Sequence, residues 1–184
     1  MMDGWIQTFT GRKFFPLAAR VEDVDVRDIA HALSLKCRFS GHCAKFYSVA
    51  EHSVRVSWEM ERLGKRAAMW GLMHDAAEAY VADIGGPIKK HFYVHDGDGA
   101  AETFDAAEDR LLAVIAHALG FEAVQYEAVR EADYTLLVTE ARDLLGPPPE
   151  PWGMVQTPLE GRIEPWGPAA AEKAFLERFE ELRG

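Results

Sequence analysis

Two adjacent residues with metal-ligating side chains stand inside an apolar stretch of the chain. His74 and Asp75 occur in the segment GLMHDAAEAYV (71–81), directly after the apolar residues Met69, Trp70, Leu72 and Met73. A polar or charged group in such surroundings is costly unless it is paired or binds a metal ion. A lone His-Asp pair is more often a solvated pair on a helix surface, so a metal site requires further ligands elsewhere.

Two such ligands occur on separate predicted helices. His52 lies 22 residues before His74, in the first turns of a helix that begins at Ser48, and Asp133 lies 58 residues after Asp75 in VREADYTLLVTEAR (129–142). Two imidazole nitrogens and two carboxylates, with open positions left over, suit a catalytic divalent ion such as Mn, Co, Fe, Zn or Mg. We therefore predict His52, His74, Asp75 and Asp133 as the metal ligands.

Glu78 is the first candidate for proton transfer. It stands four residues after His74 and three after Asp75, which places it on the same face of an uninterrupted helix. A carboxylate beside a metal-bound water can take its proton or pass one to a leaving oxygen. The alternative is an exposed helix residue.

Three residues are candidates for binding a phosphorylated substrate. Arg38 carries a planar cation suited to bidentate phosphate contact, although an ordinary surface arginine explains it equally well. Lys89 follows the helix break at Gly85-Gly86-Pro87 and offers a point charge, with a solvated Lys89-Lys90 pair as the alternative. The Phe39 ring either stacks on a base or packs in the core, and the residues alone favour the core.

Other histidines and cysteines give weaker patterns. Cys37, His42 and Cys43 lack the paired Cys-x-x-Cys spacing and the fourth partner of a zinc site. His91 and His95 are four residues apart between the His-Asp pair and Asp133, so a second metal ion remains a less favoured interpretation.

The order of these residues resembles that of the HD-domain phosphohydrolases. The contexts SVAEHS, MHDAAEAYVADI and EAD are most similar to the small branch that contains bacterial 5′-deoxynucleotidases and phage deoxynucleotide triphosphohydrolases. The resemblance covers roughly residues 25–145. It implies an all-α fold and the four metal ligands His52, His74, Asp75 and Asp133.

The resemblance also implies roles for residues around the ligands. Arg38-Phe39 match a substrate-contacting arginine and aromatic pair, with Phe where the deoxynucleotidases usually have Trp. Glu78 and Asp83 match the catalytic carboxylates, and Pro87-Ile88-Lys89 matches a Pro-x-Lys segment. Val81 departs from the pattern, because the deoxynucleotidases often carry Thr there.

The elements that position these residues are predominantly helical. A short hairpin is predicted over residues 5–17 with its turn at Thr10-Gly11, and HDGDGA (95–100) reads as a mobile loop. A capping box at Ser48 and Glu51 begins the helix of His52. The chain is thus predicted to be an all-α HD-domain helical bundle with a small N-terminal β-hairpin, forming one domain over 1–184 with its core at about 25–145 and a C-terminal loop and helix at 146–184. The predicted helices begin near 25, 48, 65, 100, 126 and 168.

Charge and composition limit the partners. The 184 residues carry a net charge of −10 and two cysteines. A broad nucleic-acid surface is disfavoured because polyanion binding needs clustered Lys and Arg, although a cation can reverse the sign within one pocket. No apolar run approaches the roughly 20 residues of a membrane span, and no secretory signal is recognisable. We expect a cytoplasmic protein with a small nucleotide substrate, and a homo-oligomer formed through the Phe- and Leu-rich C-terminal helix.

The predicted function is metal-dependent hydrolysis of 5′-phosphorylated (deoxy)nucleotides, of the 5′-nucleotidase type. One alternative is a dNTP triphosphohydrolase that releases nucleoside and triphosphate, which a second phosphate partner such as Lys90 or Arg12 would favour. A di-iron HD-type oxygenase would need two metal ions. A non-catalytic, metal-stabilised binding protein is disfavoured by the presence of Glu78 and Asp83.

Overall fold

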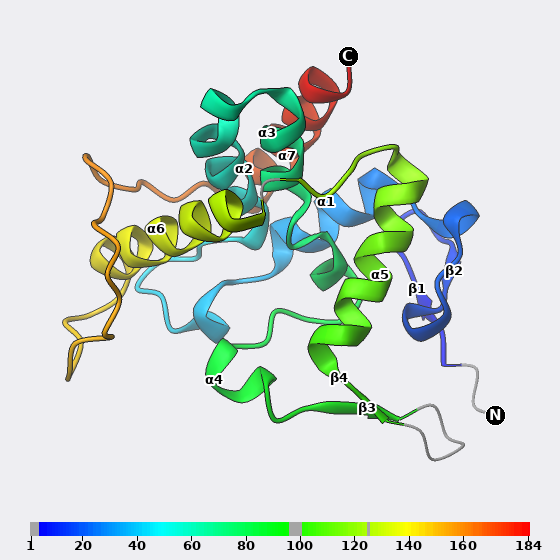
Figure 1. The fold of residues 1–184 in the computed structure, drawn as a ribbon, viewed down its shortest axis with the longest axis horizontal. Helices are drawn as coiled ribbons and strands as arrows, with labels where there is room; N and C mark the ends of the chain where they lie inside the picture. The colour runs from blue at the N-terminus through cyan, green and yellow to red at the C-terminus, as the bar shows by residue number, and fades with distance from the viewer. Residues whose placement is uncertain (1–3, 96–100, 125) are drawn as a thin grey trace.

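The computed structural model describes residues 4–95, 101–124 and 126–184, and most of them are helical (Figure 1). The predicted helical bulk and N-terminal hairpin are therefore confirmed. Within the described ranges no helix combines the length and apolar character needed to cross a membrane. The elements are β1 (Ile6–Gln7), β2 (Lys13–Phe14), α1 (Val26–Leu35), α2 (Val49–Met60), α3 (Lys65–Met73), α4 (Gly86–Lys89), β3 (Tyr93–His95), β4 (Ala101–Thr103), α5 (Phe104–Leu119), α6 (Tyr126–Leu144) and α7 (Pro168–Arg183).

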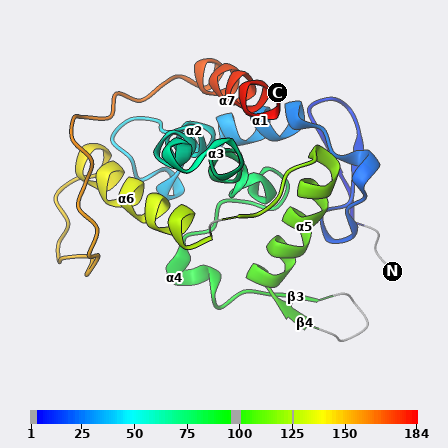
Figure 2. The ribbon, with the colours of Figure 1, turned by 45° about the horizontal axis from the view of Figure 1, so that its top comes forward.

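Helix α2 is the centre of the fold. The helices α1, α3, α6 and α7 all pack against it, so most of its residues are buried (Figure 2). The Ser48 hydroxyl accepts the Glu51 N–H at 3.1 Å, as the capping box predicts. A capping box also requires the Glu51 side chain to accept the Ser48 N–H. That part of the prediction is wrong, because the Glu51 carboxylate accepts hydrogen bonds from the Arg55 guanidinium and from Trp166 N instead. Glu51 therefore ties α2 to the segment that leads into α7.

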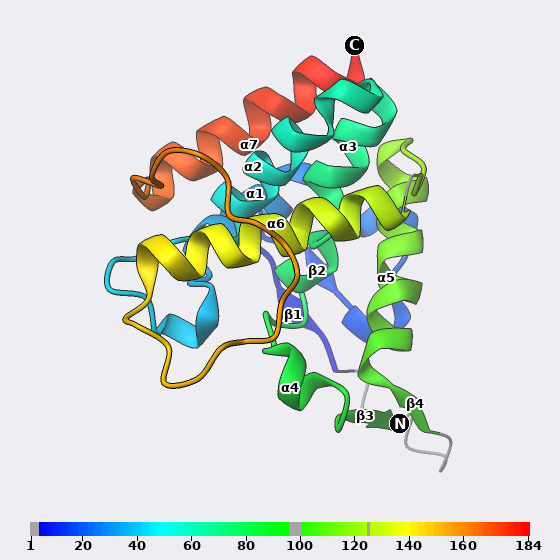
Figure 3. The same ribbon diagram turned by 60° about the vertical axis from the view of Figure 1, so that its left-hand side comes forward.

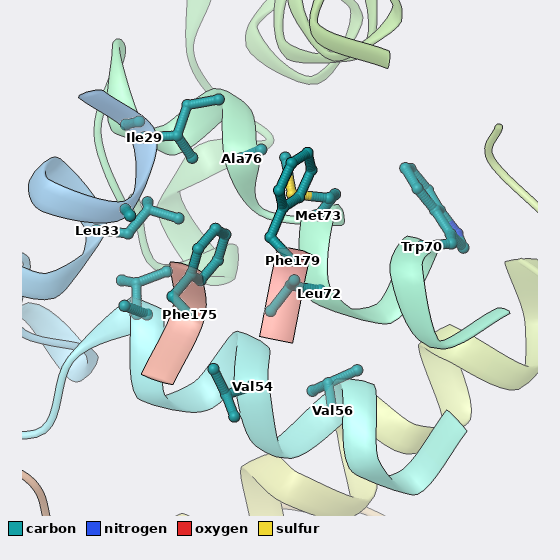
Figure 4. Close-up of a cluster of buried hydrophobic side chains, with 14 of the residues drawn as sticks. Ile29, Leu33, Val54, Val56, Trp70, Leu72, Met73, Ala76, Phe175 and Phe179 are labelled. Atoms are coloured by element: carbon teal, nitrogen blue, oxygen red, sulfur yellow. The ribbon is translucent and has the colours of Figure 1, made fainter. Parts of the chain in front are cut away.

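The hydrophobic core lies between α7 and the first three helices. Phe175 and Phe179 of α7 are 0% and 1% exposed. Burying a side chain of this size contributes about 1.5–3 kcal/mol each. The two rings lie among aliphatic and sulfur-containing side chains that are also fully buried (Figure 4): Ile29 and Leu33 of α1, Val54 and Val56 of α2, and Leu72 and Met73 of α3.

The N-terminal hairpin supports the segment after the His-Asp pair. Strands β1 and β2 pair antiparallel, with Ile6 opposite Phe14. Asp28 of α1 accepts hydrogen bonds from the backbone and hydroxyl of Thr10 at 2.6 and 2.9 Å. The Phe14 ring stacks on Tyr80, with 3.8 Å between centroids. The hairpin is thus fastened to α1 at its turn and to residue 80 at its second strand.

Helix α6 packs against α2 and α3, whereas α5 packs at the edge of the molecule against the turn Ala76–Ala79 (Figure 3). The helix predicted from residue 100 begins instead at Phe104, where the Thr103 hydroxyl accepts the Ala106 N–H. Residues 101–103 form β4, which pairs antiparallel with β3, and this second hairpin was not predicted. Strands of three residues are too short to show a period in the sequence. Of the predicted mobile loop HDGDGA, residues 96–100 lie outside the described residues.

Candidate metal centre

The His-Asp pair lies at the end of a helix, whereas the sequence predicted it in the middle of one. Helix α3 ends at Met73, Asp75 has φ −99° and ψ 12°, and a 3₁₀ turn follows at Ala76–Ala79. The alanine-rich segment favours a continuous helix, but the stacking of Tyr80 on Phe14 fixes the chain beyond it, and such tertiary contacts override local propensity. The backbone conformation of Asp75 is one in which many active-site residues are found.

Both predicted histidine ligands are oriented through Nδ1. His52 is fully buried, and its Nδ1 lies 2.6 Å from Glu140 Oε1. His74 Nδ1 lies 2.8 Å from the Gly71 carbonyl oxygen. Each acceptor takes the Nδ1–H of its ring, so Nε2 is the atom that each ring presents to a cation. Both Nε2 atoms are buried and have no hydrogen-bond partner in the described part of the chain, as expected of nitrogens that bind a cation.

Helix α3 approaches α2 closely at the residue that orients His74. A Cβ atom on Gly71 would lie 3.0 Å from Met60 Cγ and 3.2 Å from Ser57 Cα, so only glycine fits without a shift. The close contact brings the end of α3, and with it His74, beside His52. The two imidazole centroids are 5.4 Å apart.

The four predicted ligands come together from three parts of the chain. Donor atoms of His52, His74 and Asp75 all lie within 4.8 Å of one another and form a possible metal-binding group. Asp133 of α6 adjoins this group, with Oδ1 3.1 Å from His52 Nε2, and Asp75 Oδ1 is 3.3 Å from His74 Nε2. Ligand atoms at right angles on a cation, with bonds of about 2.1 Å, are about 3 Å apart. The spacing therefore fits a shared cation.

The electrostatics of the group favour a positive charge at its centre. Burial by itself lowers the pKa of His52, and Arg38 lowers it further, but the carboxylates of Glu140 and Asp133 raise it to about 9. Burial acts to raise the pKa of Asp133, yet the contact with His52 and the charges of His74 and Arg38 hold it well below its usual range. The site thus holds excess negative charge that a proton or a metal ion neutralises.

Glu140 is a site residue that the sequence reasoning missed. It is fully buried, and its carboxylate accepts hydrogen bonds from His52 Nδ1, from the Tyr47 hydroxyl at 2.9 Å and from Arg38 Nε at 3.1 Å. Such a carboxylate behind a histidine ligand orients the ring and raises its basicity. One signal was available: Glu140 stands seven residues after Asp133, two helical turns along the same face of α6.

Arg38 is held inside the site and is not a surface arginine. Its side chain is 12% exposed, and it lies between Glu140 and Asp75, with Nη1 3.6 Å from Asp75 Oδ2. Phe39 and Ser40 follow with φ of 55° and 51°, a left-handed conformation that strains non-glycine residues. Phe39 is only partly buried, so the core interpretation does not hold; its ring lies 6.4 Å from that of Trp152.

Both predicted catalytic carboxylates lie near the metal group. Glu78 is 8% exposed, and its Oε2 is buried with no hydrogen-bond partner among the described residues. Burial raises the pKa of Glu78 well above its usual range, and the charges of Asp75 and Asp83 add to this effect. Asp83 is half-buried, and burial together with Asp75 raises its pKa, against the influence of Arg38. The two carboxylates thus belong to the same electrostatic cluster as Asp75.

Comparison with known proteins places the chain among relatives without a described function. It is 35% identical over 185 residues to the uncharacterized protein YfdR of Escherichia coli (strain K12), covering 97% of this chain and 95% of YfdR. This chain belongs to the YfdR family. The uncharacterized protein RCAP_rcc00048 of Rhodobacter capsulatus is 31% identical over 156 residues, which are 79% of this chain and 76% of that relative. No family model matches the chain.

The predicted phosphate-binding lysine of this YfdR-family protein is already paired. Lys89 Nζ contacts the carboxylate of Glu108, which is 9% exposed, and lies 3.7 Å from Asp105 Oδ1. Lys89, Glu108 and Glu78 line a cavity of about 230 Å³ together with His74 and Asp75. Lys89 is therefore beside the site, but a phosphate would have to compete with Glu108 for its ammonium group.

The remaining candidates in the YfdR-family chain lie apart from the metal group. Among the residues that the structure describes, His52, His74 and Asp75 form the group of at least three ligands with metal spacing, and neither His91 and His95 nor Cys37, His42 and Cys43 form another. His91, His95 and Lys90 are exposed. Arg12 donates to Glu22 O and Asp25 Oδ2.

Proposed function

We propose that this YfdR-family chain is a metal-dependent phosphohydrolase of the HD type that removes the 5′-phosphate from (deoxy)nucleotides. The observation that carries the proposal is the pair of buried Nε2 atoms of His52 and His74, which have no hydrogen-bond partner among the described residues and are flanked by the carboxylates of Asp75 and Asp133. The resemblance of the order His…His-Asp…Asp to HD-domain enzymes agrees with this arrangement.

The ligand set and its surroundings suit phosphate-ester hydrolysis. Two nitrogens and two carboxylates are typical of Mn, Co, Fe or Zn sites, and Mg is compatible. A divalent cation bound there supplies Lewis-acid chemistry, polarising a phosphoryl oxygen and acidifying a coordinated water. The Arg38 guanidinium, next to Asp75, stabilises the negative charge of the phosphate.

Glu78 and Asp83 are the carboxylates that we assign to proton transfer. Glu78 lines the 230 Å³ cavity beside His74, and its Oε2 has no hydrogen-bond partner in the part of the chain that the structure describes. It takes a proton from the attacking water or passes one to the leaving oxygen of the nucleoside, depending on its protonation state. Asp83 shares the charge cluster with Glu78 and Asp75 and assists in positioning the proton.

The placement of the other basic and metal-ligating residues favours monophosphates. A triphosphate needs additional cationic partners, but Arg12 is engaged with Asp25, Lys89 is paired with Glu108, and Lys90 points to solvent. A di-iron oxygenase needs a second metal ion, and His91 and His95 lie exposed, outside the metal-binding group.

Incubation of metal-loaded protein with nucleoside mono-, di- and triphosphates, followed by product identification, tests the proposal. We expect inorganic phosphate and nucleoside from monophosphates, loss of activity on chelation, and loss of both metal and activity in His74→Ala. The exposed His91→Ala variant is the matched control and should retain both. Release of intact triphosphate would support the alternative enzyme instead. Full metal occupancy with no product from any nucleotide would refute the proposal.

A further inference from the structure

A cavity of about 590 Å³ adjoins the metal centre on the side of α5 and α6. Two of the predicted metal ligands, His74 and Asp133, form part of its wall. Its volume falls within the range of small-molecule sites, about 300–1,000 Å³. A ligand in this cavity would therefore reach the metal centre directly.

The remaining wall is mainly apolar and includes two aromatic rings. Leu112, Ala113 and Val129 contribute aliphatic surface from α5 and α6. The rings of Trp70 and Tyr126 meet edge to face at 5.6 Å. Figure 4 shows Trp70 standing apart from the other labelled core side chains. The Tyr126 side chain is 62% exposed, so it lies at the mouth of the cavity and not in the core.

We infer that this cavity receives the base of the nucleotide whose phosphate lies at the metal centre. The inference rests on the proposed function and extends it to the part of the substrate that is flat and weakly polar. A nucleotide has its charged phosphate at one end and its aromatic base at the other. The cavity likewise has the candidate metal ligands His74 and Asp133 in one part of its wall and the rings of Trp70 and Tyr126 in another. Stacking on an aromatic side chain stabilises any bound base, because every base has a flat aromatic face.

Phe39 offers the rival position for the base. Its ring lies 6.4 Å from that of Trp152, but among the described residues it lines neither the 590 Å³ nor the 230 Å³ cavity at His74. At the mouth of the larger cavity, Arg130 and Glu127 form an exposed ion pair at 2.6 Å, which supplies donors and acceptors for base edges. These contacts favour the cavity of Trp70 and Tyr126 over Phe39.

Filling the cavity with a larger side chain tests this assignment. Ala113 lines the cavity from an exposed position of α5, so Ala113→Trp should fold normally. Ala106 is exposed on the same helix but does not line the cavity, and Ala106→Trp is the matched control. The measured quantity is kcat/KM for a nucleoside 5′-monophosphate divided by kcat/KM for 2-deoxyribose 5-phosphate, which has no base.

We expect Ala113→Trp to lower this ratio by roughly 5–150-fold, the range expected for lost stacking, because kcat/KM falls far more for the nucleotide than for 2-deoxyribose 5-phosphate. Ala106→Trp should keep the wild-type ratio. An unchanged ratio in Ala113→Trp overturns the inference, as does a ratio that falls only in Phe39→Ala. A parallel fall for both substrates also overturns it, because the effect would then not concern the base.

Nucleoside binding separates failure of the inference from failure of the proposed function. If the wild-type protein hydrolyses no phosphate ester, calorimetric titration with the nucleoside alone still reports on the cavity. Binding that is lost in Ala113→Trp and retained in Ala106→Trp supports the base site. Absence of nucleoside binding to the wild-type protein overturns it.

Discussion

Replacing Glu140 by glutamine preserves the shape of a fully buried side chain and removes its charge. In the wild-type protein the Glu140 carboxylate accepts hydrogen bonds from three donors: His52 Nδ1, the Tyr47 hydroxyl and Arg38 Nε. Glutamine has one oxygen and one NH₂ group, so it cannot accept from all three. We expect Glu140→Gln to weaken metal binding and to lower the free energy of unfolding, through two separable effects.

The size of each effect follows from the orientation of the amide. If its oxygen faces His52 and Tyr47, its NH₂ meets the Arg38 Nε–H, and a charge-assisted hydrogen bond worth about 1.5–3 kcal/mol is lost. If its NH₂ faces His52, the ring must accept at Nδ1 and carry its proton on Nε2, the atom that the metal requires. Changes of this kind behind a histidine ligand lower metal affinity by roughly 10–100-fold, which corresponds to about 1.4–2.7 kcal/mol.

Calorimetric titration with Co²⁺ or Mn²⁺ measures the affinity, and urea unfolding of the metal-free protein measures the stability. Glu51→Gln is the matched control, because Glu51 is also fully buried, bonds to Arg55 and Trp166 N, and adjoins His52 in the chain. It should lower stability and leave metal affinity unchanged. Wild-type metal affinity in Glu140→Gln, or equal weakening in both variants, would show that Glu140 does not orient His52 for the metal.

Four further predictions concern other parts of the site and the C-terminal segment. Asp75→Ala should abolish metal binding and hydrolysis while circular dichroism shows unchanged helix content; full activity after chelation and metal re-addition would contradict the ligand assignment. Glu78→Gln should keep metal occupancy near wild type while kcat falls by roughly 10²–10⁴-fold, and equal loss of metal would make Glu78 a ligand instead. Arg38→Ala should raise KM for every phosphorylated substrate by a similar factor, which corresponds to the loss of about 1.5–3 kcal/mol of binding free energy. A strongly base-dependent effect would argue against phosphate contact. Hydrogen bonds from the Arg142 side chain and from Ile163 N hold the pKa of Asp143 below its usual range. The stability that this lowered pKa provides is present above the unfolded pKa of about 3.9 and is lost as pH falls below it, so the urea midpoint of Asp143→Asn should fall less on acidification than that of the wild-type protein.

The candidate ligands His74 and Asp75 could be singled out because ligating side chains are rare in apolar surroundings such as theirs. His52 and Asp133 were singled out by their places on other predicted helices and by the HD-domain resemblance, and the structure brings all four side chains close together. Glu140 also lies on α6, but its role depends on contacts with α1–α2 loop residues and α2 that only the packed fold reveals. A single sequence indicates that such a group is buried without indicating what it faces.

Local propensity explains the errors in the elements. It predicted a continuous helix through His74 and Asp75, because nothing in AAEA signals that Tyr80 is held by Phe14. The sequence likewise indicated Lys89 as a phosphate ligand or a member of a solvated lysine pair, because its partner Glu108 stands 19 residues later on another helix. In both cases a contact between distant segments decided the outcome, whereas the positive φ of Gly64 and Gly120, which follow helical segments, is a feature of the local backbone.

Helix α7 has a consequence for how the chain folds during synthesis. Its Phe175 and Phe179 fill the core between α1, α2 and α3, yet they are synthesised only after the whole of α4, α5 and α6. Until these residues leave the ribosome, α2 lacks the packing contacts of α7, and apolar surface on α1, α2 and α3 stays exposed to water. The helices that carry His52 and His74 can therefore reach their final packing only after translation has passed residue 179, and nascent chains stalled before that point present a surface for chaperones.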